Sequence, residues 1–310
     1  MNNSLSCPTS SKEILMLTIT AWYVLIFSTV GIVTNCLSFI TVYSMKTKSS
    51  ATIYLQALAF WDFASILFDG VVDITQSKYF LDWTVPDILF LQQIEHSADW
   101  VTNSVAHWIV VVISFDRFTA LYFPIFYKNV FSSKKTASFL TFCVVVLNII
   151  FIGVPTSIMH YNCENSLCKV RPRFQSPLIT FTLLTMSGFM PMFIILACNL
   201  FIVLKIYCNK RNIERFKNSG IDRLLSIATT TFIVLVSAAE ISYFVNYFSN
   251  LIRNECSIYK KVVRFFENAT LTTNHGINFF LYILLCKAFR IQFINLFTNA
   301  GGLFRLNPNL

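Results

Sequence analysis

Two groups of charged residues bound an apolar stretch in the middle of the chain. Asp99 precedes Arg117 by 18 residues, and no charge lies between Asp99 and Asp116. Eighteen residues are five turns of an α-helix at about 3.6 residues each, so both side chains lie on one face about 27 Å apart. A desolvated carboxylate attracts cations, whereas an arginine at the end of an apolar helix needs an anionic partner. The spacing places Asp99, a candidate for binding a cation, near one end of a helix and an Asp116–Arg117 pair near the other.

A second carboxylate, Asp62, lies within an apolar stretch. A lone carboxylate in such surroundings shifts its pKa or finds polar partners. We expect Asn35, Asn274 and Asn278 to be those partners. The alternatives for this cluster are a hydrogen-bonded group without an ion and a group that holds one.

Long charge-free stretches are the elements that must position these residues. Most can hold the roughly 20 residues that a bilayer-spanning helix needs. Seven helices are predicted, over about Ile14–Tyr43, Ser50–Asp73, Leu91–Tyr122, Thr136–His160, Pro177–Tyr207, Asp222–Leu251 and Val262–Cys286. A segment with aromatic residues at a spacing of four, Lys287–Phe297, follows and is typical of a short helix in the membrane interface.

Composition supports a membrane protein, because 55% of the 310 residues are hydrophobic and only 13% are charged. We expect an all-α protein: a seven-transmembrane helix bundle with a short amphipathic C-terminal helix. The predicted parts are an N-terminus at 1–13, a bundle at 14–286, and the amphipathic helix with a short tail at 287–310. The N-terminal residues lack a basic region and a cleavage site, so the first helix is expected to act as the insertion signal.

Lysine and arginine predict the orientation. With the N-terminus outside, most of the 24 lysines and arginines fall on the inner side, as the positive-inside rule requires. The net charge of +9 therefore reflects topology, and nucleic-acid binding is not expected. A multi-pass protein of the plasma membrane with a cytoplasmic C-terminus is the expectation.

The chain resembles the rhodopsin-like G protein-coupled receptors over nearly all of its length. The residues that carry the resemblance are Gly31 and Asn35; Leu58, Ala59 and Asp62; Asp116-Arg117-Phe118 in place of D-R-Y, followed by Pro124 and Ile125; Pro191; and Asn278-Phe279-Phe280-Leu281-Tyr282 in place of N-P-x-x-Y, followed by Phe289-Arg290. The N-F-x-x-Y form with an upstream asparagine is most similar to invertebrate neuropeptide receptors of the FMRFamide type. The resemblance implies a receptor that binds an extracellular ligand and activates a heterotrimeric G protein, without catalysis or a cofactor.

The resemblance also implies roles for residues. Asp116, Arg117, Phe118, Pro124 and Ile125 would form the G protein contact. An activation network would comprise Asn35, Asp62, Asn274, Asn278 and Tyr282. In the family this cluster holds a sodium ion, for which Asp62, Asn274 and Asn278 are the candidates here. Ala106 replaces a helpful serine, and His275 stands beside Asn274, so the cluster without an ion stays open.

Asp99 is the leading ligand candidate, because amine and some peptide receptors of the family hold a cation with a carboxylate at this position. Further acidic or polar candidates surround it: Glu95, Asn103, Asp69, Asp73, Glu240 and Glu267. A peptide ending in an amidated Arg-Phe fits, since guanidinium and carboxylate groups pair bidentately. A chemosensory receptor for a small molecule is the alternative.

The cysteines depart from the family, whose helix-three cysteine is Gln92 here. Four cysteines fall on the expected outer side: Cys7, Cys163, Cys168 and Cys256. They allow three pairings, of which we favour Cys163 with Cys168 and Cys7 with Cys256.

Other classes fit less well. A light receptor needs a lysine within the seventh helix, where Thr272 stands. A membrane enzyme or a heptahelical transporter would show histidines and carboxylates at relay spacing or inverted repeats, and His107, His160 and His275 look scattered along the sequence. Helix six lacks the family's C-W-x-P kink and has Leu235-Val236-Ser237-Ala238 instead, so its hinge is expected to differ.

Overall fold

The protein is a bundle of long helices. The computed structural model describes residues 11–45, 49–68, 89–157, 162–164, 167–169, 177–208, 230–231, 234–238, 241 and 258–303. Its long helices are α1 (Ser11–Tyr43), α2 (Ser50–Ser65), α4 (Leu89–Tyr122), α6 (Lys134–Asn148), α9 (Met190–Cys208), α12 (Ile258–Leu285) and α13 (Lys287–Leu303).

Short elements extend or join these helices. They are α5 (Pro124–Phe126), α7 (Val154–Ser157), α8 (Pro177–Leu184), wide π-helical turns at Tyr127–Phe131, Ile149–Gly153 and Thr185–Phe189, and the strands β1 (Asn162–Glu164) and β2 (Leu167–Lys169). The strands pair antiparallel, with Cys163 directly opposite Cys168.

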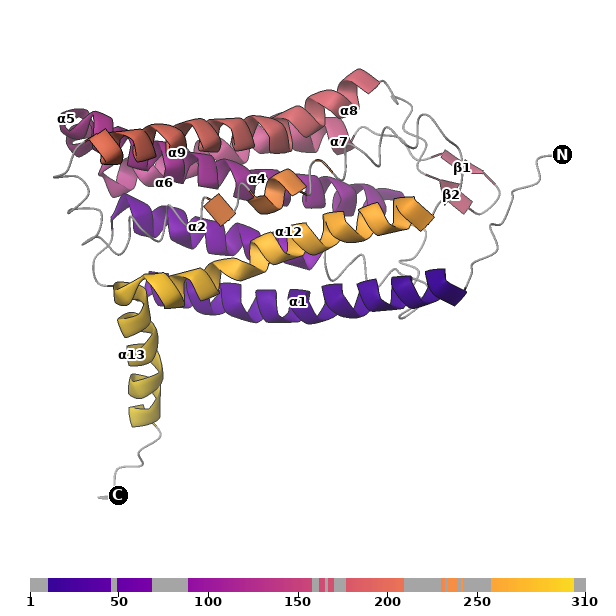
Figure 1. Ribbon diagram of the computed structural model, residues 1–310, viewed down its shortest axis with the longest axis horizontal. Helices are drawn as coiled ribbons and strands as arrows, with labels where there is room; N and C mark the ends of the chain where they lie inside the picture. Colours follow the sequence, from indigo (N-terminus) through magenta and orange to yellow (C-terminus); the bar gives the residue numbers. More distant parts are fainter. Residues whose placement is uncertain are drawn as a thin grey trace.

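Five helical spans in the described part of the chain are long and apolar enough to cross a membrane: Trp22–Tyr43, Ser50–Phe68, Ser97–Tyr122, Lys134–Ser157 and Phe181–Lys205. Two further helical segments, Ala269–Leu284 and Lys287–Thr298, pass the same test only when they are taken together, and they are bent by 91° between α12 and α13. Figure 1 shows the long helices aligned along the bundle and α13 projecting sideways from one end. This is the geometry expected of a helix that lies along a membrane surface.

α4 occupies the middle of the bundle, where it packs against α2, α6 and α9, while α1 packs between α2 and α12. The buried core follows α4, with Val105, Ile109 and Ile113 at a spacing of four on its inward face. We call the end of the bundle that carries Arg117 the inner end and the end that carries Asp99 the outer end, following the predicted orientation.

The predicted helix bounds are close to the observed ones, and the differences have local causes. α6 starts at Lys134 rather than Thr136, because Ser133 caps it by accepting the Thr136 N–H. α12 starts four residues before the predicted Val262, and α13 continues six residues past Phe297. Apolar length fixes only the part of a helix inside the bilayer, so it does not predict the helical turns beyond that part.

Much of the predicted sixth helix lies outside the described residues. Within it, 234–238 are helical, so Leu235-Val236-Ser237-Ala238 forms part of a helix. Val236 is buried in the core, and the Ser237 hydroxyl donates to Met192 Sδ at 2.8 Å. This turn of the sixth helix therefore faces α9.

Candidate functional site

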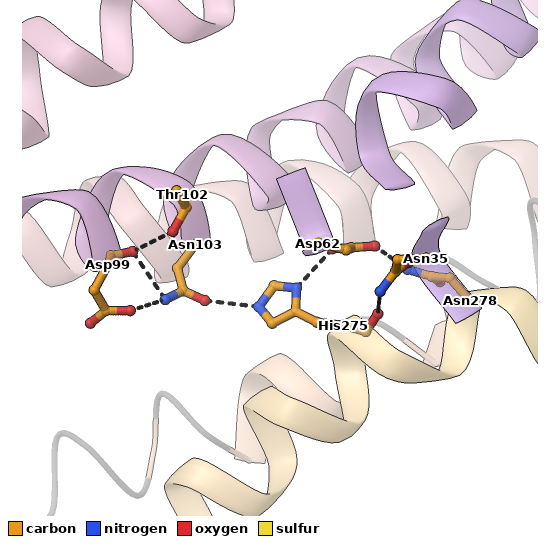
Figure 2. A network of polar contacts seen from close by, with 7 residues as sticks. All are labelled: Asn35, Asp62, Asp99, Thr102, Asn103, His275 and Asn278. Atoms are coloured by element: carbon orange, nitrogen blue, oxygen red, sulfur yellow. Dashed lines mark hydrogen bonds and ion pairs between the residues drawn. The ribbon is translucent and has the colours of Figure 1, made fainter. Parts of the chain in front are cut away.

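Asp62 lies at the centre of a buried polar cluster (Figure 2). Its side chain is 2% exposed, and both carboxylate oxygens have a partner from α12. His275 Nδ1 lies 2.7 Å from Oδ1, and Asn278 Nδ2 donates to Oδ2 at 2.6 Å. Positions 275 and 278 are one turn apart, so α12 presents both side chains to α2 together.

A chain of hydrogen bonds runs from this cluster to the outer end of α4 (Figure 2). His275 Nε2 lies 2.8 Å from Asn103 Oδ1. Asn103 Nδ2 donates to Asp99 Oδ1 at 2.6 Å and to the Asp99 backbone carbonyl at 3.1 Å. The chain therefore connects the predicted ligand residue Asp99 to Asp62 through two side chains.

Close approach of α1 and α12 positions a further member of the predicted network. A Cβ added at Gly31 would lie 2.6 Å from Ile66 Cδ1 and 3.5 Å from the Gly276 Cα. Without a side chain at Gly31, the two helices approach closely enough for Asn35 Nδ2 to donate to the His275 carbonyl at 2.9 Å. Asn35 thus holds the backbone that carries His275.

The predicted activation network is brought together in part. Asp62 and Asn278 bond directly, Asn35 contacts the α12 backbone, and Asn274 and Tyr282 are buried on α12. The direct partner that sequence reasoning missed is His275. A signal existed, because His275 precedes Asn278 by three residues and therefore shares its helix face.

The expectation that the histidines are scattered is wrong for two of them. His107 of α4 and His275 of α12 stack with their ring centroids 6.2 Å apart and an interplanar angle of 7°. Sequence separation hid this proximity, since the two helices are distant in the chain. His160 lies outside the described residues.

The cluster does not fit the sodium ion that the resemblance implies. A hard cation requires oxygen lone pairs around it, but each Asp62 oxygen faces a nitrogen instead. On the α4 side, Ala106 is buried and has no side-chain oxygen to add. The His275 ring lies next to the Asp62 carboxylate, in the position that a sodium ion would need.

At the inner end, Asp116 and Arg117 form the predicted pair. Arg117 Nη2 lies 3.8 Å from Asp116 Oδ2. The Tyr127 hydroxyl donates to the same oxygen at 3.3 Å and lies 3.1 Å from the Ser50 hydroxyl at the start of α2. Burial raises the pKa of Tyr127 above its ordinary value, so this hydroxyl stays protonated as a donor. Asp116 is thereby tied to α2 through Tyr127, a residue that the motif did not reveal.

The residues that flank this pair present an aromatic and apolar surface. Phe118 stacks on Tyr122 with ring centroids 4.8 Å apart, and the Tyr122 hydroxyl donates to the Phe201 carbonyl of α9 at 2.9 Å. Pro124 begins α5, where a proline is favoured because its missing N–H has no helical partner. Next to it, Ile125 is 78% exposed. The short helix α5 thus displays a large apolar side chain just after the inner end of α4.

Hydrogen bonds from α4 compensate for the backbone N–H that Pro191 of α9 lacks. Because proline has no N–H, Pro191 cannot bond the Ser187 carbonyl four residues before it. His107 Nδ1 lies 2.9 Å from that carbonyl and must donate to it. The Met190 N–H donates to the Thr185 carbonyl. In a regular α-helix it would donate to the Met186 carbonyl instead. Here the Met186 carbonyl accepts from Trp108 Nε1 at 3.0 Å.

Phe279 stands where the resemblance predicts a proline, and it packs rather than kinks. Its ring contacts Phe289 and Phe293 of α13, with centroids 6.0 and 5.4 Å away. Arg290 Nη1 donates to the Ile283 carbonyl near the end of α12 at 3.2 Å. α13 is therefore held against α12 by an aromatic cluster and by Arg290, whose guanidinium caps carbonyls near the end of α12.

The remaining predicted site residues are less fully described. α4 and α12 contain Glu95 and Glu267, but their side chains are not among the described ones. Asp69, Asp73, Glu240, Cys7 and Cys256 lie outside the described residues. Cys163 and Cys168 are register partners in the paired strands β1 and β2, while their bonding remains a prediction.

Comparison with known families matches residues 34–282 to the seven-transmembrane receptors of the rhodopsin family. A comparison with curated proteins finds no match. The family match confirms the predicted fold class of an all-α, seven-helix membrane bundle. Members of this family bind extracellular ligands and signal through G proteins, and they are multi-pass membrane proteins rather than enzymes. Since the match covers most of the chain and the bundle places the family's motifs as expected, the chain belongs to the rhodopsin family of seven-transmembrane receptors.

Proposed function

We propose that this receptor binds a cationic extracellular ligand at Asp99 and that the ligand is a neuropeptide ending in an amidated Arg-Phe. The receptor lies in the plasma membrane with its N-terminus outside. The observation that carries the proposal is the hydrogen-bond chain from Asp99 through Asn103 and His275 to Asp62.

Asp99 has the chemistry to take a guanidinium group. Its side chain is partly buried near the outer end of α4, where reduced solvent strengthens its attraction for a cation. Asn103 donates to Oδ1. A carboxylate is also the group with which an arginine pairs through two parallel bonds.

Binding at Asp99 has a physical route into the bundle. A guanidinium that attracts the Asp99 carboxylate competes with Asn103 for it. Asn103 Oδ1 is also the partner of His275 Nε2, so a rotation of that amide changes the hydrogen bonding of the Asp62 cluster. A ligand shifts an equilibrium between conformations only through such differential contacts.

The inner end is the proposed transducer site. Arg117 is paired with Asp116 in this conformation, and release of that pair would expose its guanidinium to the G protein. Ile125, exposed in α5 just after the inner end of α4, would supply an apolar contact to the G protein.

The test begins with a panel of amidated peptides applied to cells that express the receptor, with G protein activation as the readout. An active peptide is then compared with its analogue in which citrulline, a neutral isostere, replaces arginine. Both are assayed on wild type and on Asp99→Asn.

For the arginine peptide, Asp99→Asn should cost about 2–5 kcal/mol, since one partner of a buried charge pair is removed. That is a loss of roughly 30-fold or more in potency at about 1.4 kcal/mol per decade. For the citrulline peptide the substitution should have little effect. As a control, Glu95→Gln one turn outward should cost only about 0–1 kcal/mol, as for an exposed pair. Equal losses with both peptides would refute the charge pairing, and activation by uncharged small molecules alone would favour a chemosensory receptor.

A further inference from the structure

We infer that the polar centre of this receptor excludes sodium, because His275 takes the place of the ion as a built-in partner of Asp62. The inference concerns the Asp62 cluster and is independent of which ligand binds at the outer end. It follows from the hydrogen-bond donors and acceptors around His275.

The orientation of the Asn103 amide is fixed from the outer side. Both contacts of its nitrogen are to Asp99 oxygens, the backbone carbonyl and Oδ1, and these oxygens accept hydrogen bonds. The amide oxygen of Asn103 must therefore face His275 Nε2, as observed at 2.8 Å. An amide oxygen is an acceptor only, so Nε2 carries a hydrogen.

The other ring nitrogen, Nδ1, lies 2.7 Å from Asp62 Oδ1. A hydrogen bond of this length needs one hydrogen between the two atoms. Either Nδ1 carries it, which gives an imidazolium beside a carboxylate, or the carboxyl group carries it and donates to Nδ1. In both arrangements the Asp62–His275 pair holds two protons and has no net charge. The second carboxyl oxygen accepts from Asn278 in either case.

A neutral pair removes the attraction for a cation. Sodium would be drawn to an uncompensated carboxylate, but here each Asp62 oxygen is engaged in a hydrogen bond with a nitrogen of α12, and the pair with His275 is neutral. The neighbouring groups supply no replacement anion in the described part of the chain. The His107 ring stacks on His275, Asn35 is engaged with the His275 carbonyl, Tyr282 is a buried phenol near Asp62, and Asp99 is separated from His275 by Asn103.

The experiment measures the apparent melting temperature of the purified full-length receptor in detergent. Sodium chloride is exchanged for choline chloride at constant ionic strength, so that only a specific sodium effect appears. For wild type we expect the melting temperatures to coincide across the exchange. A saturable stabilisation of wild type by sodium, lost in Asp62→Asn, would overturn the inference.

A gain-of-binding variant tests whether His275 is the cause. His275→Ser removes the imidazole, leaves Asp62 without its partner and adds a hydroxyl oxygen, so it should acquire a saturable stabilisation by sodium. The matched control Asp62→Asn/His275→Ser lacks the carboxylate and should not. Sodium insensitivity of a folded His275→Ser would contradict the role of His275.

If the serine variant does not fold, the protonation states of Asp62 and His275 can be measured directly in wild type. Nitrogen magnetic resonance of isotopically labelled histidine, with infrared spectra of the carboxyl region, should show two protons on the pair. A His275 with an unprotonated Nδ1 beside an ionised Asp62 would refute the inference.

Discussion

The joint between His107 and the Ser187 carbonyl predicts a specific coupling to Pro191. In His107→Phe the ring is kept and can still stack on His275, but the donor to the Ser187 carbonyl is lost. That carbonyl lies in a buried residue of the π-helical turn Thr185–Phe189, and Pro191 offers it no backbone N–H. A buried acceptor without a donor costs about 1–3 kcal/mol, while interhelical hydrogen bonds in membranes contribute about 0.6 and at most about 1.7 kcal/mol. We therefore expect His107→Phe to destabilise the receptor by about 1–2 kcal/mol.

Pro191→Ala provides the decisive background, because alanine restores the N–H that an α-helix donates to the residue four positions earlier. In Pro191→Ala the Ser187 carbonyl accepts from the backbone N–H of residue 191. In that background, His107→Phe should therefore reduce the stability by less than half as much as it does in the wild-type background. The four proteins form a double-mutant cycle, which isolates the coupling between the two positions.

The assay is the apparent melting temperature of the four purified proteins in the same detergent, with ligand absent. An equal loss of stability on His107→Phe in both backgrounds would refute the idea that His107 replaces the N–H that Pro191 cannot donate to the Ser187 carbonyl. The π-helical turn Thr185–Phe189 can become regular α-helix in Pro191→Ala. The expectation is then unchanged, because the N–H of residue 191 donates to the Ser187 carbonyl in that helix as well.

Three further predictions concern the transducer end and the outer hairpin. Arg117→Ala should abolish G protein activation while surface expression is retained, and full signalling by this variant would remove Arg117 from the transducer site. Ile125→Ala should lower the maximal response without changing ligand affinity, because its exposed side chain is lost from the proposed G protein contact; the same truncation at Val130, also exposed, is the control, and equal effects of the two would contradict a specific anchor. Cys163 and Cys168 should be bonded to each other, so in mass spectrometry of a non-reduced digest the peptide that contains both should be lighter by two hydrogens than the same peptide after reduction, and a link from Cys163 to Cys256 would overturn this pairing.

Sequence reasoning found the parts of the site that follow from local spacing. Asp116 and Arg117 are neighbours in sequence, so their pairing needed only the apolar helix in front of them. Asp62 was predicted to have polar company because a carboxylate in an apolar helix requires it, and Asn278 is indeed a partner.

Contacts that depend on how the helices are rotated against one another were missed. His275 was read as a neighbour of Asn274, yet its ring bridges Asp62 of α2 and Asn103 of α4. Likewise, Tyr127 reaches Asp116 from the π-helical turn that follows α5. Such contacts depend on how the elements pack in space, and hydrophobic periodicity does not reveal them.

Departures from a motif carried information that the structure explains. Phe279 replaces the proline of the family's motif, and its aromatic ring packs α13 against α12. The role of His107 follows from Pro191, since a proline in a helix predicts an unsatisfied carbonyl four residues earlier. The identity of the donor required the packing of α4 on α9.

The proposed function requires that a cationic ligand bound at Asp99 activates a G protein. Its most direct test is nucleotide exchange on a purified heterotrimeric G protein with the reconstituted receptor, in the presence of amidated Arg-Phe peptides. We expect exchange that rises with peptide concentration in wild type and requires roughly 30-fold or more peptide in Asp99→Asn. Peptide-dependent exchange with the same potency in both proteins would contradict it, and so would the absence of exchange with every peptide of this class.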